Sequence, residues 1–142
     1  MSLRVYYAHA MGYYGSPREA QVQALLHSLG CEVVCPNAPE HERGFQAFGM
    51  GYFDVEFLPR IDVIAYEPYD DGMIGAGVAY ELQRCIDAGL TVWRIDRLPG
   101  VASSDVQGLL VSHEPPQWRP NTLKVLGREV TRARNLAIKE AA

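Results

Sequence analysis

The sequence predicts one three-layer α/β/α domain, built on a parallel sheet of four or five strands and spanning all 142 residues. Short apolar runs alternate along the chain with segments whose apolar residues recur at helical spacing, and glycine or proline stands at most of the boundaries. Alternating strands and helices indicate βαβ units, which cover both faces of a parallel sheet with helices. Apolar residues make up 48% of the chain, enough for a buried core.

The strands are predicted from runs rich in β-branched and aromatic residues, which favour extended backbone. Four such runs are bounded by polar residues, glycine or proline, and a fifth is weaker: 3–8, 32–35, 61–66, 90–95 and 109–111. The carboxyl ends of parallel strands meet at one edge of a sheet, and ligands of such sheets bind there. We therefore expect the site beside the residues that follow the first four strands.

Helices are predicted where apolar residues recur every three or four positions. The first is best defined, because Ser16 is a suitable N-cap, Pro17 and Glu19 fit a capping box, and Gly30 would end the helix after about Leu29. Further helices are expected at about 52–58, 78–88 and 122–139, with a proline-rich turn at 114–120. Two polar segments are expected to be binding loops, 36–51 and 67–77.

Composition and charge argue against several classes of function. The net charge of −4 disfavours binding of nucleic acid, because proteins that bind its backbone usually carry a basic face. Backbone N–H groups could still hold a single nucleotide. No apolar run reaches the roughly 18 residues that a membrane helix needs. The start of the chain lacks the layout of a signal peptide. We therefore expect a cytoplasmic protein with no membrane partner.

The cysteines and histidines lack the spacing of a metal site. Cys31, Cys35 and Cys85 form no C-x-x-C pair, and an odd number gives no complete disulfide framework. All three lie in apolar surroundings and are expected to be buried, unreactive thiols. His41 and His113 have no ligand partners at metal-binding spacing, so neither a metal nor a cofactor is predicted.

The segment most suggestive of chemistry is 75–82, which follows a strand and opens a helix. Gly75 and Gly77 would let a ligand approach the backbone, where the first N–H groups of the helix are free to bind an anion. The buried stripe of this helix is expected to be Val78, Leu82, Cys85 and Ile86. At about 100° per residue, Glu81 lies about 60° from Val78, at the border of core and crevice. The pattern alone favours an ordinary solvent-facing glutamate placed there by the helix dipole, and it does not name a reaction.

Five short segments carry a resemblance to a known superfamily: Tyr6-Tyr7-Ala8-His9, Asp54 with Leu58, Ile61-Asp62-Val63-Ile64, Gly77-Val78-Ala79-Tyr80-Glu81-Leu82 and Leu90-Thr91-Val92. In order and spacing they resemble the nucleoside 2-deoxyribosyltransferases and the related 2'-deoxynucleoside 5'-monophosphate N-glycosidases. The resemblance covers about residues 3 to 95. It implies a flavodoxin-like form of the predicted fold. It also implies a homodimer or larger homo-oligomer, for which the C-terminal helix, with Leu123, Val130 and Leu136, is a candidate interface.

The resemblance implies catalytic roles for three residues. Glu81 would be the nucleophile that attacks the anomeric carbon of a deoxyribose and forms a covalent glycosyl-enzyme. Tyr6 would orient the Glu81 carboxylate by a hydrogen bond. Asp54 would lie near the leaving base and protonate or hold it. Water as acceptor would make the protein a hydrolase, and a second base would make it a transferase of nucleosides or nucleotides.

The chain departs from this superfamily at Gly75, where the transferases have Asp and the monophosphate glycosidases have Ser. Asp70 or Asp71 could replace that acid. The first loop lacks the Arg and Ser of the monophosphate enzymes, and Arg18 is the nearest cation. The residues expected to contact substrate are His9, Gly12, Asp71, Gly75 and Gly77, with Tyr13, Tyr14, Phe45 and Phe48 as aromatic side chains that could stack on a base.

Two other functions fit the same features. The missing polar side chain at Gly75 favours a module that binds a nucleotide without cleaving it. An NAD glycohydrolase is the second alternative, because the related TIR fold also uses a glutamate.

Overall fold

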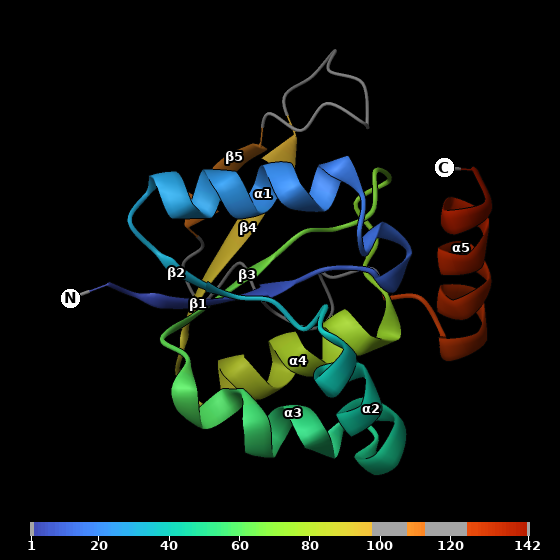
Figure 1. Ribbon diagram of the computed structural model, residues 1–142, viewed down its shortest axis with the longest axis horizontal. Helices are drawn as coiled ribbons and strands as arrows, with labels where there is room; N and C mark the ends of the chain where they lie inside the picture. The colour runs from blue at the N-terminus through green and yellow to red at the C-terminus, as the bar shows by residue number, and fades with distance from the viewer. Residues whose placement is uncertain (1, 98–107, 113–124, 142) are drawn as a thin grey trace.

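The computed structural model describes residues 2–97, 108–112 and 125–141 (Figure 1). Its sheet has the strand order β2-β1-β3-β4-β5. The strands are β1 (Arg4–Ala8), β2 (Glu32–Val34), β3 (Val63–Tyr66), β4 (Thr91–Arg97) and β5 (Gly108–Ser112). The first four pair in parallel, whereas β5 runs antiparallel to β4. The predicted fold is therefore confirmed with four parallel strands, and the fifth strand forms an antiparallel edge.

Helices cover both faces of the sheet, and one further helix stands across the edge where β1 ends (Figure 1). The helices are α1 (Pro17–Ser28), α2 (Pro39–Phe48), α3 (Gly51–Glu56), α4 (Ala76–Asp87) and α5 (Arg128–Ala141), with short 3-10 helices η1 (Met11–Tyr13) and η2 (Leu58–Arg60). In Figure 1, α1 lies over one face, and α4 with α3 and α2 lies over the other. None of these described helices has the length and apolar character needed to cross a membrane.

The strand β1 supplies both halves of the core, because successive side chains point to opposite faces. Val5 and Tyr7 pack against α1, whereas Tyr6 and Ala8 pack among residues of α3 and α4. The two tyrosines also hold buried carboxyl groups. Tyr7 donates a hydrogen bond to Glu67 at 2.8 Å on one face, and Tyr6 donates one to a glutamate of α4 on the other.

The predicted start of α1 is confirmed. The Ser16 side chain accepts a hydrogen bond from the Glu19 N–H at 3.2 Å, as expected for an N-cap. The Glu19 carboxylate, however, accepts from the N–H of Gly15 at 3.1 Å rather than from that of Ser16, so only half of the predicted capping box forms. Gly30 follows the helix with a φ of 81°, and Leu29, at which the helix was expected to end, is 54% exposed.

The prediction that 36–51 is a loop is wrong, because α2 occupies most of it. Pro39 stands in the first turn and two glutamates follow it, which are helix-start signals hidden by the polar composition. Gly49, with a φ of 63°, ends the helix. Phe45 then packs edge-on against Tyr52 of α3, with ring centres 4.9 Å apart.

The remaining boundaries differ by a few residues. The short helix predicted at 52–58 divides into α3 and η2, and α4 begins two residues before its predicted start. The proline-rich turn at 114–120, His113, Leu123 and the first residues of the predicted C-terminal helix lie outside the described residues. The exposed candidates for an interface, Val130 and Leu136, do lie on α5.

Candidate functional site

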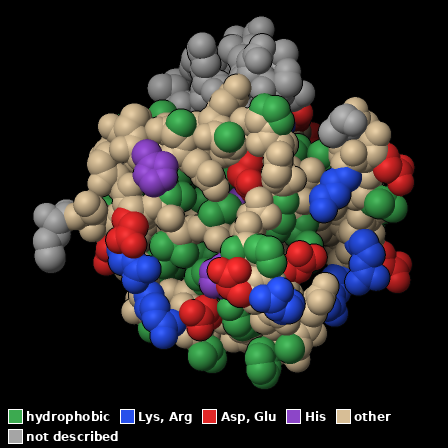
Figure 2. Space-filling view, in the orientation of Figure 1, with side chains coloured by type: hydrophobic (Ala, Val, Ile, Leu, Met, Phe, Trp, Pro, Cys, Tyr) green, Lys and Arg blue, Asp and Glu red, His purple; other side chains and the backbone are tan. Residues whose placement is uncertain are grey.

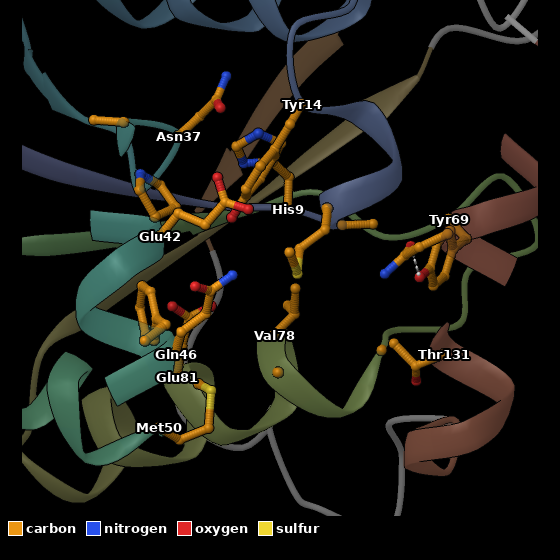
Figure 3. A pocket seen from close by; sticks show the side chains of 18 of the residues that line it. His9, Tyr14, Asn37, Glu42, Gln46, Met50, Tyr69, Val78, Glu81 and Thr131 are labelled. Carbon is orange, nitrogen blue, oxygen red and sulfur yellow. Dashed lines mark hydrogen bonds between the residues drawn. The ribbon is translucent and has the colours of Figure 1, made fainter. Parts of the chain in front are cut away.

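A pocket of about 380 Å³ lies at the carboxyl edge of the sheet, where the strand order predicts a site (Figure 3). This volume is within the range of small-molecule sites. The wall comes from the segments that follow β1 and β2, from α2, from the start of α4 and from α5. Its polar side chains are His9, Tyr14, Asn37, Glu42, Gln46, Tyr69, Glu81, Thr131 and Asn135.

Glu81 and Tyr6 lie together, as the resemblance implies. Glu81 sits in the second turn of α4 and is only 6% exposed, yet it lines the pocket. Its Oε2 accepts a hydrogen bond from the Tyr6 hydroxyl. Tyr6 is fully buried between Phe53 and Phe57, whose ring centres are each 5.0 Å away. This packing fixes the hydroxyl that holds the carboxyl group.

Burial raises the pKa of Glu81 from its ordinary value of 4.5 to about 8, and the hydrogen bond from Tyr6 opposes this rise. The dipole of α4 favours the ionised form only weakly here, because its effect is greatest in the first turn and Glu81 lies beyond that turn. Burial, and then the nearby Glu81, also raise the pKa of Tyr6, which therefore remains a donor. The carboxyl group is largely protonated at neutral pH.

Asp54 is not among the pocket-lining residues. Its Oδ2 accepts from the Tyr80 hydroxyl at 2.7 Å and its Oδ1 from Arg84 Nε at 2.9 Å. In α3 it follows Phe53, which points into the core, so the helical rotation turns Asp54 toward the exposed flank of α4. In the single chain, therefore, the structure does not bring Asp54 to Glu81.

Two of the expected substrate contacts, Gly12 and Asp71, also lie away from the pocket lining. A Cβ on Gly12 would be 3.0 Å from the Cα of Asn135, so this glycine provides space for α5 rather than for a ligand. Asp71 is exposed and pairs with Arg134 of α5 at 2.8 Å. Similarly, Asp70 pairs with Arg18 at 2.9 Å. The loop that carries both aspartates is thus held against α1 and α5.

Gly75 and Gly77 both line the pocket, as expected, but the two glycines have different roles there. A Cβ on Gly75 would meet Thr131 Cγ2 at 2.7 Å, so the absence of a side chain lets α5 approach the start of α4. Thr131 Oγ1 then accepts a hydrogen bond from the Ala76 N–H at 3.1 Å. A Cβ on Gly77 would have no neighbour within 4 Å, so here the backbone is open to a ligand.

His9 lines the pocket with its ring rather than with a free nitrogen. Its Nε2 lies 2.6 Å from Glu19 Oε2, and its Nδ1 lies 3.1 Å from the Tyr7 carbonyl oxygen. The ring stacks on Tyr7 at 3.8 Å and lies tilted 4.9 Å from Tyr14. With both nitrogens engaged, the geometry favours a structural role for His9 over that of a catalytic base.

Of the aromatic candidates, Tyr14 and Phe45 line the pocket. Burial, and then Glu81, raise the pKa of Tyr14, and its hydroxyl has no hydrogen-bond partner among the described residues, so it can donate to a ligand. Tyr13 instead packs under the Arg18 guanidinium at 3.8 Å, and Phe48 is 74% exposed away from the pocket.

Several lining residues were not named as contacts, among them Asn37, Gln46 and Asn135. Asn37 follows β2, at one of the strand ends where the site was expected. Gln46 was obscured when α2 was interpreted as a loop. Asn135 comes from α5, and no signal in the sequence places that helix at the pocket.

The pocket carries no cation in its described lining, which contains two carboxyl groups, those of Glu42 and Glu81, and neither lysine nor arginine. On the face shown in Figure 2, acidic and basic side chains are interspersed rather than gathered by sign.

Comparisons of the chain with protein families, with curated proteins and with solved structures gave no match. The functional groups of the pocket are therefore a buried carboxyl group, hydrogen-bonded to a tyrosine, and the amides and hydroxyls of the neighbouring side chains.

Proposed function

We propose that the protein cleaves or transfers at the N-glycosidic bond of a nucleoside, with Glu81 as the nucleophile. The observation that carries the proposal is a single buried carboxyl group, held by Tyr6, at the wall of a pocket of ligand size. A carboxylate held in this way is suited to attack a sugar carbon from a fixed direction. This is also the arrangement that the resemblance to the deoxyribosyltransferase-like superfamily implies.

The reaction follows from the two oxygens of Glu81. Oε2 is held by Tyr6, whereas Oε1 has no hydrogen-bond partner among the described residues and is free to attack. A bond forms between Oε1 and the anomeric carbon while the bond from that carbon to the base nitrogen breaks. The base leaves with the electron pair and takes up a proton from water. A second water, or a second base, then attacks the same carbon while its bond to Oε1 breaks, which frees Glu81 and gives the free sugar or a new nucleoside.

The lining favours a nucleoside over a nucleotide. A phosphate dianion would find no lysine or arginine in the described lining to offset its charge. A neutral nucleoside needs no such partner, and the amides of Asn37, Gln46 and Asn135 can hydrogen-bond to its base or sugar. The same charge argument weighs against NAD, which carries a pyrophosphate.

A non-catalytic binding module is the second candidate. Two observations favour it: the pKa of Glu81 is about 8, so little carboxylate exists at neutral pH, and Asp54 is not beside the pocket to assist the leaving base. In that case Glu81 would serve as a neutral hydrogen-bonding group.

Incubation with deoxynucleosides, their 5'-monophosphates and NAD, followed by chromatography for free base, tests the proposal. Release of base from deoxynucleosides, lost in Glu81→Gln and retained in Glu42→Gln, is the expected result. Glu42 is the matched control because it is the other carboxylate of the lining and is exposed. Binding of a nucleoside without base release would favour the binding module, and base release by Glu81→Gln would overturn the proposal.

A further inference from the structure

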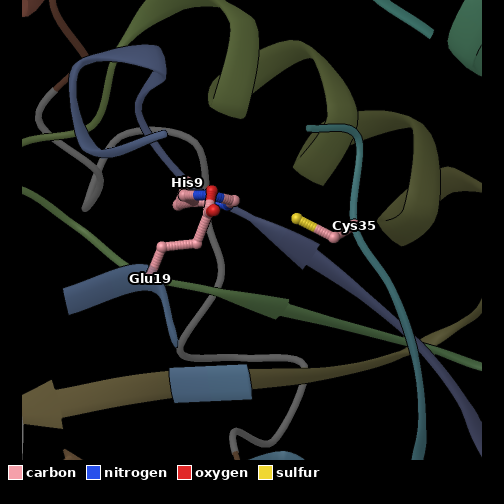
Figure 4. Close-up of side chains that lie close together, drawn as sticks. All are labelled: His9, Glu19 and Cys35. Atoms are coloured by element: carbon pink, nitrogen blue, oxygen red, sulfur yellow. The ribbon is translucent and has the colours of Figure 1, made fainter. Parts of the chain in front are cut away.

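Three side chains of different ligand type converge beside the pocket (Figure 4). His9 follows β1, Glu19 is in the first turn of α1 and Cys35 follows β2. Their ligand atoms, Nε2 or Nδ1, a carboxylate oxygen and Sγ, all lie within 4.8 Å of one another. His9 and Glu19 are buried and Cys35 is half-buried, and in Figure 4 the sulfur points toward the other two side chains. Cys35 therefore lies in a polar cluster, not in the purely apolar surroundings expected from the sequence.

Hydrogen bonds to the neighbouring backbone and to Asn37 orient two of these side chains. The Tyr7 carbonyl oxygen can only accept, so the His9 Nδ1 at 3.1 Å carries a hydrogen, which directs Nε2 toward Glu19. On the other side, Glu19 Oε1 accepts from Asn37 Nδ2 at 2.7 Å and from the Gly15 N–H at 3.1 Å, which leaves Oε2 for the cluster. Metal-binding histidines and carboxylates are commonly held by such outer hydrogen bonds.

We propose that His9 Nε2, Glu19 Oε2 and Cys35 Sγ together bind a zinc ion. Without metal, one proton lies between Nε2 and Oε2, which are 2.6 Å apart, and another is on the thiol. Zinc would replace these two protons, so the overall charge of the buried group would not change. This balance matters because an uncompensated buried charge is costly.

The ligand set selects the kind of metal. Thiolate with imidazole suits zinc and does not suit magnesium or calcium, which prefer oxygen ligands. Three protein ligands leave a fourth tetrahedral position for water. Tetrahedral bonds of about 2.0–2.3 Å place neighbouring ligand atoms roughly 3.3–3.6 Å apart. Nε2 and Oε2 must therefore separate by about 0.7 Å, and a pair at the 4.8 Å limit must approach by about 1.2 Å.

The site does not depend on the proposed glycosidic chemistry. It would join the ends of β1 and β2 to the start of α1. His9, a member of the cluster, and Asn37, which binds Glu19 of the cluster, also line the pocket. Zinc would thus fix one wall of the pocket in place, whatever reaction occurs there.

Isothermal titration of untagged, chelator-treated protein with zinc chloride tests the proposal. We expect one ion per chain and an affinity at least tenfold weaker in Cys35→Ser. Cys31→Ser is the matched control, because Cys31 is a buried thiol four positions earlier that belongs to the apolar core and not to the cluster. Its affinity for zinc should equal that of the wild type.

Cobalt substitution reports the ligands directly. The sulfur-to-cobalt charge-transfer band should be present in the wild type and in Cys31→Ser and absent from Cys35→Ser, and zinc should raise the melting temperature of the same two proteins. A Cys35→Ser protein that is folded by circular dichroism keeps the comparison valid. The absence of saturable binding up to about a hundred micromolar zinc, or equal binding by Cys35→Ser, would overturn the proposal.

Discussion

The buried carboxyl group of Glu81 makes a quantitative prediction about stability and pH. The pKa of Glu81 rises from 4.5 to about 8 because folding removes the group from water. A raised carboxyl pKa means that the native state disfavours the ionised form. This cost is absent below about pH 4.5, grows as the pH rises and is complete above about pH 8. Each pKa unit is worth about 1.4 kcal/mol, so the full cost is on the order of 5 kcal/mol.

Glu81→Gln removes this cost while keeping the shape, and its amide oxygen can still accept from the Tyr6 hydroxyl. We expect the two proteins to have similar free energies of unfolding at pH 5. At pH 9 the variant should be more stable by several kcal/mol. Urea unfolding followed by tryptophan fluorescence at pH 5, 7 and 9 measures the difference.

Glu42→Gln is the control, because Glu42 lines the same pocket but is exposed. Its difference from the wild type should stay within about 0.5 kcal/mol at each pH, as for ordinary surface changes. Equal pH dependence of the wild type and Glu81→Gln would refute the reasoning, since it would mean that Glu81 ionises in the folded protein as easily as in the unfolded chain.

Four further predictions concern the proposed reaction. Glu81→Ala should reduce base release by several orders of magnitude, measured by chromatography, because no other carboxyl group lies beside Tyr6 in the described part of the chain. In the wild type, kcat/KM should rise with pH, with an apparent pKa near 8, since the nucleophile must be ionised; a profile that is flat from pH 6 to 9 would contradict this. Tyr6→Phe removes a hydrogen bond that lowers the pKa of Glu81, so the rising limb should move to higher pH and turnover at pH 7 should fall at least tenfold. Asp54→Asn should leave base release within about threefold, because its carboxylate binds Tyr80 and Arg84 outside the pocket; a much larger loss would indicate that Asp54 reaches a site by another route, such as a neighbouring subunit.

The sequence was sufficient for the central strands because β1 and β3 are buried on both faces. Runs such as 61–66 are then apolar at almost every position and stand out from polar neighbours. The helix α2 was missed for the opposite reason. Its composition is mostly polar and none of its residues is buried, so the segment was interpreted as a loop although its few apolar residues recur at helical spacing. Pro39 and the glutamates after it mark the start of the helix.

Residues of the site were predictable where a single element fixes their direction. Glu81 follows from the helical rotation of α4 relative to Val78, and Tyr6 follows from the resemblance at β1. Asp54 was expected at the pocket, but its direction depends on how α3 packs against α4, which sequence spacing does not specify. The contact between Gly75 and Thr131 joins residues far apart in the chain, so the part of α5 in the pocket could not be inferred.

The adjacent tyrosines of β1 also tie the register of the strand to both faces of the sheet. Tyr6 and Tyr7 point to opposite faces, and each donates to a buried glutamate there, Glu81 on one side and Glu67 on the other. A slip of one residue in the pairing of β1 would exchange the two faces of the strand, and both glutamates would lose their donors at once. The two hydrogen bonds therefore favour a single register of β1, in addition to the apolar packing on each face.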